Sequence, residues 1–162
     1  MWLPPNFDGI LPELRAVPNW VLADNSKVPR HPGGWKASPT NAATWSTFAQ
    51  VRSSYDANRH AGIGYVLDGK PHFSGKYLHG FDWDHCVADW EINPNVLATV
   101  NKLNISRLEI STSGTGLRGF FLHDEPIPSC RTKIDGRSVE LYSDAHYMIT
   151  TGWVYRGMEM LL

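Results

Sequence analysis

The chain has 162 residues, of which 42% are hydrophobic and 19% charged, so it can bury the core of one globular domain and is not a disordered tail. Its formal net charge of −1 excludes nucleic-acid binding through bulk positive charge alone, although acidic and basic residues could be sorted locally. Neither a disulfide scaffold, a zinc finger, a signal peptide nor a membrane span is indicated, and we expect a cytoplasmic protein that does not contact a membrane, in the host cytoplasm if a phage encodes it.

The N-terminal block, about residues 1–60, alternates between helical and extended patterns. Apolar residues recur at three- and four-residue spacing in the last of these segments, which is typical of one helix face. Prolines and glycines interrupt the segment before it. We predict a helix at 11–16, a strand at 20–23, a turn-rich segment at 27–40 and a helix at 44–58.

Residues 61–155 are mostly strand-like. The predicted strands are 62–67, 77–82, 108–112, 119–122, 138–142 and 147–151, with one helix between 90 and 103. This order predicts an α+β fold with one mostly antiparallel sheet. No repeat or long linker divides the chain, so residues 1–162 are interpreted as a single domain.

Two aspartates, Asp82 and Asp84, stand at the end of one predicted strand. Residues two apart on a strand point to the same side, so both carboxylates can meet one cation. Hard oxygen ligands suit Mg²⁺ or Mn²⁺. A DxD sequence alone is also typical of a surface turn.

A third carboxylate, Glu140, lies in another predicted strand between Val139 and Leu141. If these apolar neighbours face the core, Glu140 faces the same open side as the aspartates. Three carboxylates on two adjacent strands can hold two metal ions about 4 Å apart for in-line phosphoryl transfer. The alternative for Glu140 is an ordinary solvent-facing strand residue.

A turn rich in glycine and hydroxyl side chains lies between the carboxylates. Its backbone amides could approach an anion closely, and Arg118 at the start of the next strand could bind phosphate oxygens. A plain hairpin turn is the alternative. The candidate nucleotide-binding residues here are Ser111, Ser113, Gly114, Gly116 and Arg118.

The order of these motifs, followed by the segment 146–152, resembles the archaeo-eukaryotic primase superfamily. More narrowly, it is similar to the bifunctional primase-polymerase domains of phage and plasmid replication proteins, over about residues 20–152. The resemblance implies a ferredoxin-like (RRM-like) palm with a small N-terminal α/β subdomain. It also implies Asp82, Asp84 and Glu140 as metal ligands, and Lys36 and His146 as further nucleotide- or template-phosphate contacts.

The implied activity is template-dependent nucleotidyl transfer on single-stranded DNA template and primer, with NTP or dNTP substrates. Family members often carry a helicase domain after this core, so a C-terminal helicase domain or protein is a further expected partner. The family usually has histidine where this chain has Arg118, which puts the rate and de novo priming in question.

Two other classes of function remain open. A non-catalytic nucleotide- or DNA-binding core would keep the fold without turnover, and a metal-dependent nuclease would also use clustered carboxylates. The nuclease leaves the Ser/Gly/Arg turn unexplained. The candidate DNA contacts are Arg131, Lys133 and Arg137, in a loop predicted at 129–137.

Overall fold

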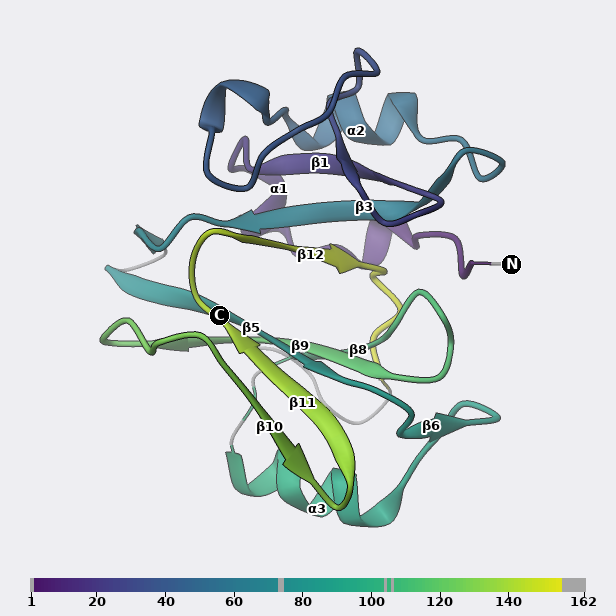
Figure 1. The fold of residues 1–162 in the computed structure, drawn as a ribbon, viewed down its shortest axis with the longest axis vertical. Coiled ribbons are helices and arrows are strands. Elements are labelled where there is room, and N and C mark those ends of the chain that lie inside the picture. The colour runs from purple at the N-terminus through teal and green to yellow at the C-terminus, as the bar shows by residue number, and fades with distance from the viewer. Residues whose placement is uncertain (1, 73–74, 104, 106, 156–162) are drawn as a thin grey trace.

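The computed structural model describes residues 2–72, 75–103, 105 and 107–155, and Figure 1 shows two sheets one above the other. Every strand pair in it is antiparallel, and short helices flank the sheets. The fold class is therefore α+β with mostly antiparallel sheets, as predicted, and is consistent with a ferredoxin-like fold.

The first sheet has the strand order β12-β3-β1-β2. Its strands are β1 (Trp20–Asp24), β2 (Pro29–Arg30), β3 (His60–Leu67) and β12 (His146–Thr150). The helical elements of this half are η1 (Phe7–Gly9), α1 (Pro12–Arg15), η2 (Ala42–Thr44) and α2 (Phe48–Ser54). One apolar core joins η1, α1 and α2 to β1, β3 and Met148 of β12, so the first sheet depends on both halves of the chain.

The second sheet has the order β10-β11-β5-β9-β8, with β4 also paired to β5. Its strands are β4 (Pro71–His72), β5 (Lys76–Trp83), β8 (Arg107–Ile110), β9 (Leu117–His123), β10 (Cys130–Ile134) and β11 (Arg137–Tyr142). The β6 (Val87–Ala88)–β7 (Glu91–Ile92) hairpin and helix α3 (Pro94–Leu103) lie beside it. Val96 and Val100 of α3 pack with Trp83, Leu108 and Val139, which covers one face of this sheet.

The prediction of one sheet is wrong, because β3 and β5 belong to different sheets although they follow one another in the sequence. β3 pairs with β1 and with the distant β12, not with β5. The two sheets approach closely where Gly80 of β5 meets Met148 of β12. A Cβ atom at Gly80 would overlap the Met148 sulfur, so this approach needs glycine.

Two further predictions need correction. The predicted loop at 129–137 is the β10–β11 hairpin, whose Asp135 and Gly136 both have positive φ as a two-residue turn requires. The helix predicted at 44–58 is shorter, because a capping box formed by Thr47 and Gln50 starts α2 at Phe48.

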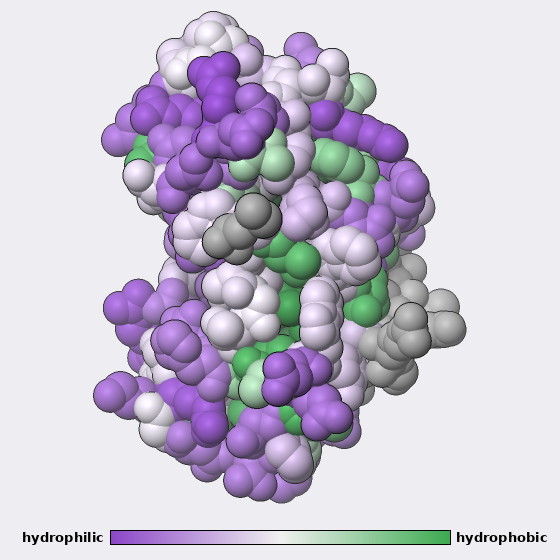
Figure 2. Space-filling view, turned by 90° about the vertical axis from the view of Figure 1, so that its right-hand side faces the viewer, coloured by the Kyte–Doolittle hydropathy of each residue, from purple (hydrophilic) through white to green (hydrophobic). Residues whose placement is uncertain are grey.

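The tryptophans do not all belong to the core. Trp20 and Trp83 are fully buried, whereas Trp35, Trp90 and Trp153 are exposed. Figure 2 shows apolar residues exposed in the middle of one face, between more hydrophilic ends.

Within the described residues, no helix combines the length and apolar character that a membrane-spanning helix needs.

Candidate active site

A row of charged side chains crosses the second sheet at one level. In the strand register Glu140 of β11 lies opposite Asp82 of β5, which lies opposite Arg118 of β9. Arg131 of β10 extends the row beyond Glu140, and Glu109 of β8 extends it beyond Arg118. Directly opposed residues share a face and bring their Cβ atoms to within about 5 Å of each other. The structure thus brings Asp82, Glu140 and Arg118 together.

Asp84 lies just beyond the end of β5, next to the turn formed by Ser111–Gly116, called the Ser/Gly turn below. It is exposed, and its backbone N–H donates to Ser138 O at 3.2 Å. The residue two positions before it, Asp82, has a side chain that is 21% exposed. Asp84 therefore continues the acidic row toward solvent without joining the carboxylates of Asp82 and Glu140 at one point.

Arginines compensate the two central carboxylates. Arg118 Nη2 lies 3.2 Å from Asp82 Oδ2, and its Nη1 donates to Ile149 O of β12 at 2.7 Å. The Nε–H of Arg118 is buried and has no acceptor within the described part of the chain. Arg131 forms an ion pair with Glu140, although the Arg131 side chain is 73% exposed. Arg118 therefore links the two sheets and keeps one unused donor at the row.

Two aromatic residues border Glu140. The Tyr142 hydroxyl donates to Glu140 Oε2, and the His146 ring stacks on the Tyr142 ring with centroids 3.5 Å apart. Burial, followed by the bond to Glu140, raises the pKa of Tyr142 to about 12. Burial lowers the pKa of His146, although Glu140 and Asp82 oppose this shift. Tyr142 thus stays a hydrogen-bond donor at neutral pH. It was not among the residues that the sequence pattern identified.

The Ser/Gly turn closes on itself beside the end of β5. Ser111 N–H donates to Gly116 O, and Gly116 N–H donates back to the Ser111 hydroxyl at 3.0 Å. The hydroxyls of Ser111, Ser113 and Thr115 form a chain of 3.0 Å contacts. Gly114 has a φ of +77°, which favours glycine. Ser113 is exposed, so the turn offers hydroxyl and amide groups near Asp84.

Replacing Gly116 by alanine is expected to impair the site. A Cβ atom there would lie 2.8 Å from Trp83 O, a backbone atom of β5 that cannot move freely. We expect a loss of about 1–3 kcal/mol in the free energy of unfolding, measured by urea denaturation. Gly114→Ala, which has open space for the Cβ but a positive φ, is a control for backbone strain alone. An unchanged unfolding midpoint for Gly116→Ala would show that the turn can move away from β5.

The remaining basic candidates lie at different distances from the carboxylate row along the strands and sheets. Lys133 lies opposite Ser138 on the face of Glu140, whereas Arg137 donates from Nε to His85 O at 3.0 Å. Lys36 is exposed and pairs with β2, the edge of the first sheet opposite β12. Lys36 is therefore not part of the carboxylate row, and its role at a nucleotide stays a prediction.

Glu109 belongs to the same row but has a different environment. It is 1% exposed, and its Oε1 accepts from Arg107 Nε at 2.7 Å. Its Oε2 accepts from the Thr150 hydroxyl and from the backbone N–H groups of Thr151 and Gly152, at 2.6, 2.9 and 3.2 Å. Glu109 is buried and both of its oxygens are bonded inside the fold, so it fixes the chain after β12 and is not available to a ligand. The oxygens of Glu140 also have partners, Arg131 and Tyr142, but its side chain is 14% exposed and Arg131 is 73% exposed, so a ligand can reach it. The sequence gives no separate signal for it, because Leu-Glu-Ile looks the same as Val-Glu-Leu around Glu140.

The carboxylates of this site are the type of ligand that a hard cation prefers, but they are not arranged as a complete metal site. Asp82 and Glu140 lie opposite each other on neighbouring strands, and carboxylate oxygens suit Mg²⁺ or Mn²⁺. Among the described residues, however, no three His, Cys, Asp or Glu side chains are gathered as a metal site. A cation would thus be held first by Asp82 and Glu140.

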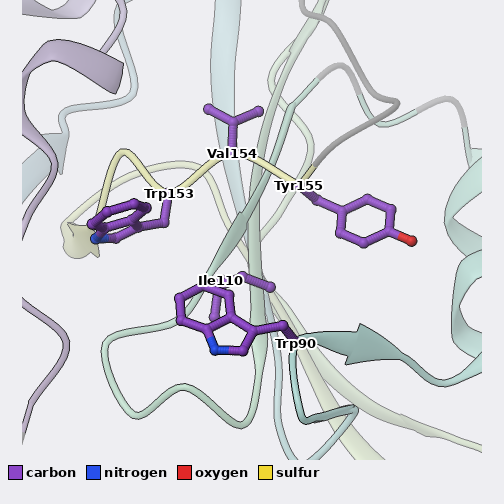
Figure 3. A pocket seen from close by; sticks show the side chains of 5 residues that line it. All are labelled: Trp90, Ile110, Trp153, Val154 and Tyr155. Atoms are coloured by element: carbon purple, nitrogen blue, oxygen red, sulfur yellow. The ribbon is translucent and has the colours of Figure 1, made fainter.

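A separate pocket of about 450 Å³ lies at the outer edge of β8 and is lined by Trp90, Ile110, Trp153, Val154 and Tyr155. Figure 3 shows Trp90 beside Ile110, with Trp153 and Tyr155 on opposite sides of their chain segment. The described residues that line it carry no charged side chain. It is therefore a poor site for a triphosphate or a cation.

No protein-family model matches the chain, and neither does any curated protein with which it was compared.

Proposed function

We propose that the chain is the catalytic core of a nucleotidyltransferase that extends a primer on a single-stranded DNA template, as a primase-polymerase of phage or plasmid replication does. The observation that carries the proposal is the direct opposition of Asp82 and Glu140 on neighbouring strands, with Arg118 next in the same row. Two carboxylates and a guanidinium side by side suit a cation-bound phosphate chain.

Each group has a defined task in this proposal. Asp82 and Glu140 would hold Mg²⁺ or Mn²⁺, and a cation bound there would supply Lewis-acid activation of a primer hydroxyl and positive charge for the leaving pyrophosphate. Arg118 binds a phosphate oxygen through the Nη2 that now lies on Asp82, while its buried Nε–H stays inside the fold. Tyr142, which donates to Glu140, orients that carboxylate. The Ser111–Gly116 turn offers exposed hydroxyls to the triphosphate.

Extension of a labelled primer on single-stranded DNA tests the proposal. NTPs and dNTPs are supplied separately, with Mg²⁺ or Mn²⁺, and products are resolved by length. Template-directed products support it, whereas shortened primers point to a nuclease. Full-length primer without products, together with metal-dependent triphosphate binding, identifies a binding core.

The binding core is the second candidate, and one observation favours it. Arg118 is already engaged with Asp82 and with Ile149 O, in place of the histidine that the resembling family usually has. A guanidinium is always charged and cannot donate a proton near neutral pH. Nucleotide binding survives this change more easily than turnover.

Arg118→Ala is expected to weaken nucleotide binding by about 10-fold or more while template binding stays the same, since it removes charge-assisted bonds to phosphate. Titrations of labelled nucleotide and labelled template, run separately, measure both affinities. Arg118→Lys is the matched control because it keeps the charge without the planar fork. Melting temperatures of both variants show whether the link to Ile149 is also lost. A fall in DNA affinity alone would contradict the triphosphate assignment.

A further inference from the structure

Positive charge is concentrated in one segment of the first half of the chain. Between Asn25 and Tyr55 no Asp or Glu occurs, although the whole chain has a net charge of −1. The basic residues of this segment are Lys27, Arg30, Lys36 and Arg52. It forms β2, the following loop and α2, at the end of the molecule opposite α3 (Figure 1). The segment itself therefore carries no carboxylate, although Asp24 pairs with Arg30 and Asp8 lies 3.7 Å from Arg52.

An exposed tryptophan is held rigidly within this segment. Trp35 is 54% exposed, and its ring lies parallel to the His31 ring, with 3.9 Å between centroids and 12° between planes. The loop between them is closed by His31 N–H to Trp35 O at 2.9 Å and Gly34 N–H to His31 O at 2.8 Å. The Trp35 ring packs against Gly33 at a distance that excludes a side chain, because a Cβ atom there would overlap the indole. The indole is therefore fixed in position while most of its surface stays open.

Cationic side chains lie on and beside the hairpin that carries this ring. Lys36 is exposed and lies opposite Arg30 across the hairpin. A pocket of about 310 Å³ beside the hairpin is lined by residues that include Arg30, His31, Arg59 and His60. Its carboxylate is Asp24, which is paired with Arg30 at 2.9 Å and accepts from two backbone N–H groups. Arg59 and Lys36 therefore remain as positive charges that Asp24 does not compensate by contact.

We propose that the Trp35 platform, defined as Trp35, His31, Lys36, Arg30 and Arg59, binds single-stranded nucleic acid. A base stacks on the open indole, while Lys36 and Arg59 contact neighbouring phosphates. Aromatic rings combined with flanking cations recognise unpaired strands, because every base has a flat face and every linkage is anionic. A rigid ring loses little conformational entropy on stacking.

The inference rests on the proposed function for the identity of the strand, a template or primer, but it concerns a surface separate from the carboxylate row. β2, which carries this hairpin, is the edge strand opposite β12, whereas Arg118 contacts β12. Binding at the platform therefore requires neither a cation nor catalysis, and can be measured without either.

The test is fluorescence anisotropy of a labelled oligodeoxythymidylate, titrated with the whole chain in EDTA at low salt. Trp35→Ala is expected to weaken binding by about 10-fold, as loss of one stacked base does. Trp90→Ala is the matched control, because Trp90 is 57% exposed but lies in the β6–β7 turn between Asp89 and Glu91. Lys36→Gln and Arg59→Gln are each expected to reduce the slope of log affinity against log salt by about 0.7.

A clearly larger loss of affinity in Trp35→Ala than in Trp90→Ala supports the platform, whereas an equal or smaller loss in Trp35→Ala overturns it. Competition by inorganic polyphosphate, which has no bases, distinguishes binding by charge from binding by stacking. Base stacking is excluded if polyphosphate binds as tightly as the oligonucleotide and Trp35→Ala changes neither affinity. Primer extension is measured in parallel. Loss of DNA binding in Trp35→Ala without any synthesis by the wild type would leave the platform standing and the proposed function failed. Synthesis by the wild type, together with unaltered DNA binding in Trp35→Ala, would support the proposed function and overturn the platform.

Discussion

Asp82→Ala is expected to abolish template-directed synthesis, with a fall of more than about 100-fold in the rate of primer extension. A carboxylate that holds a catalytic cation contributes several kcal/mol to the transition state, and each factor of ten in rate corresponds to about 1.4 kcal/mol. Asp82 lies directly opposite Glu140, so its loss leaves one carboxylate where two are needed. Retention of more than a few per cent of the wild-type rate would contradict its role as a metal ligand.

The controls for this variant follow from its contacts. Asp82 also pairs with Arg118 at 3.2 Å, so alanine leaves that guanidinium without its carboxylate. Asp82→Asn keeps an oxygen acceptor for Arg118 while removing the charge, and should preserve the melting temperature but not synthesis. Asp124→Ala removes a carboxylate whose side chain is 82% exposed and should change neither.

The Asp82 variants also separate the two explanations for the charge row. Two carboxylates on directly opposed residues require nearby positive charge, and the sequence pattern predicts metal ions in that role. In the structure, Arg118 and Arg131 supply positive charge to Asp82 and Glu140. If the row only stabilises the fold through its arginines, Asp82→Asn lowers the stability and even the wild-type protein shows no synthesis. If cations act there, synthesis depends on Asp82 although stability barely does.

Local patterns predicted the elements better than their pairing. Strict alternation and apolar runs identified β5, β9 and β11, and the same alternation placed Asp82 and Glu140 on one face. Pairing of β12 with β3 joins His146 to Leu67, two residues that lie far apart in the sequence, and no local pattern contains such a pairing. Strand β10 was missed because four of its five residues are exposed, although the Asp135-Gly136 pair that follows is a recognised hairpin signal.

The candidate site was likewise predictable only in part. The spacing of residues along the predicted strands identified Asp82 and Glu140 as candidates. The contact of Arg118 with Ile149 O could not be predicted in this way, because it depends on how the two sheets approach each other. Tyr142 gave no signal as a partner of Glu140. Exposure of Trp35 and Trp90 could not be foreseen either, because an aromatic residue among turn residues looks equally suited to a core.

Glu109 and Glu140 have the same sequence environment, and their variants are expected to behave in opposite ways. Glu109→Ala should lower the free energy of unfolding by about 3–5 kcal/mol, since it leaves Arg107, 4% exposed, as a buried charge without its carboxylate. Glu140→Ala should cost little stability, because its partner Arg131 is 73% exposed and solvent screens the pair.

Urea denaturation of both variants, together with primer extension at a temperature where each is folded, measures the contrast. Glu109→Gln is the matched variant, because it keeps an acceptor for Thr150 and the Thr151 N–H but not the charge that pairs with Arg107. Stability lost at Glu109 and synthesis lost at Glu140 would assign one carboxylate of the row to the junction of the sheets and the other to chemistry. A stable Glu109→Ala protein would mean that the segment after β12 is held by other contacts, and equal loss of stability in both variants would make Glu140 a structural residue as well.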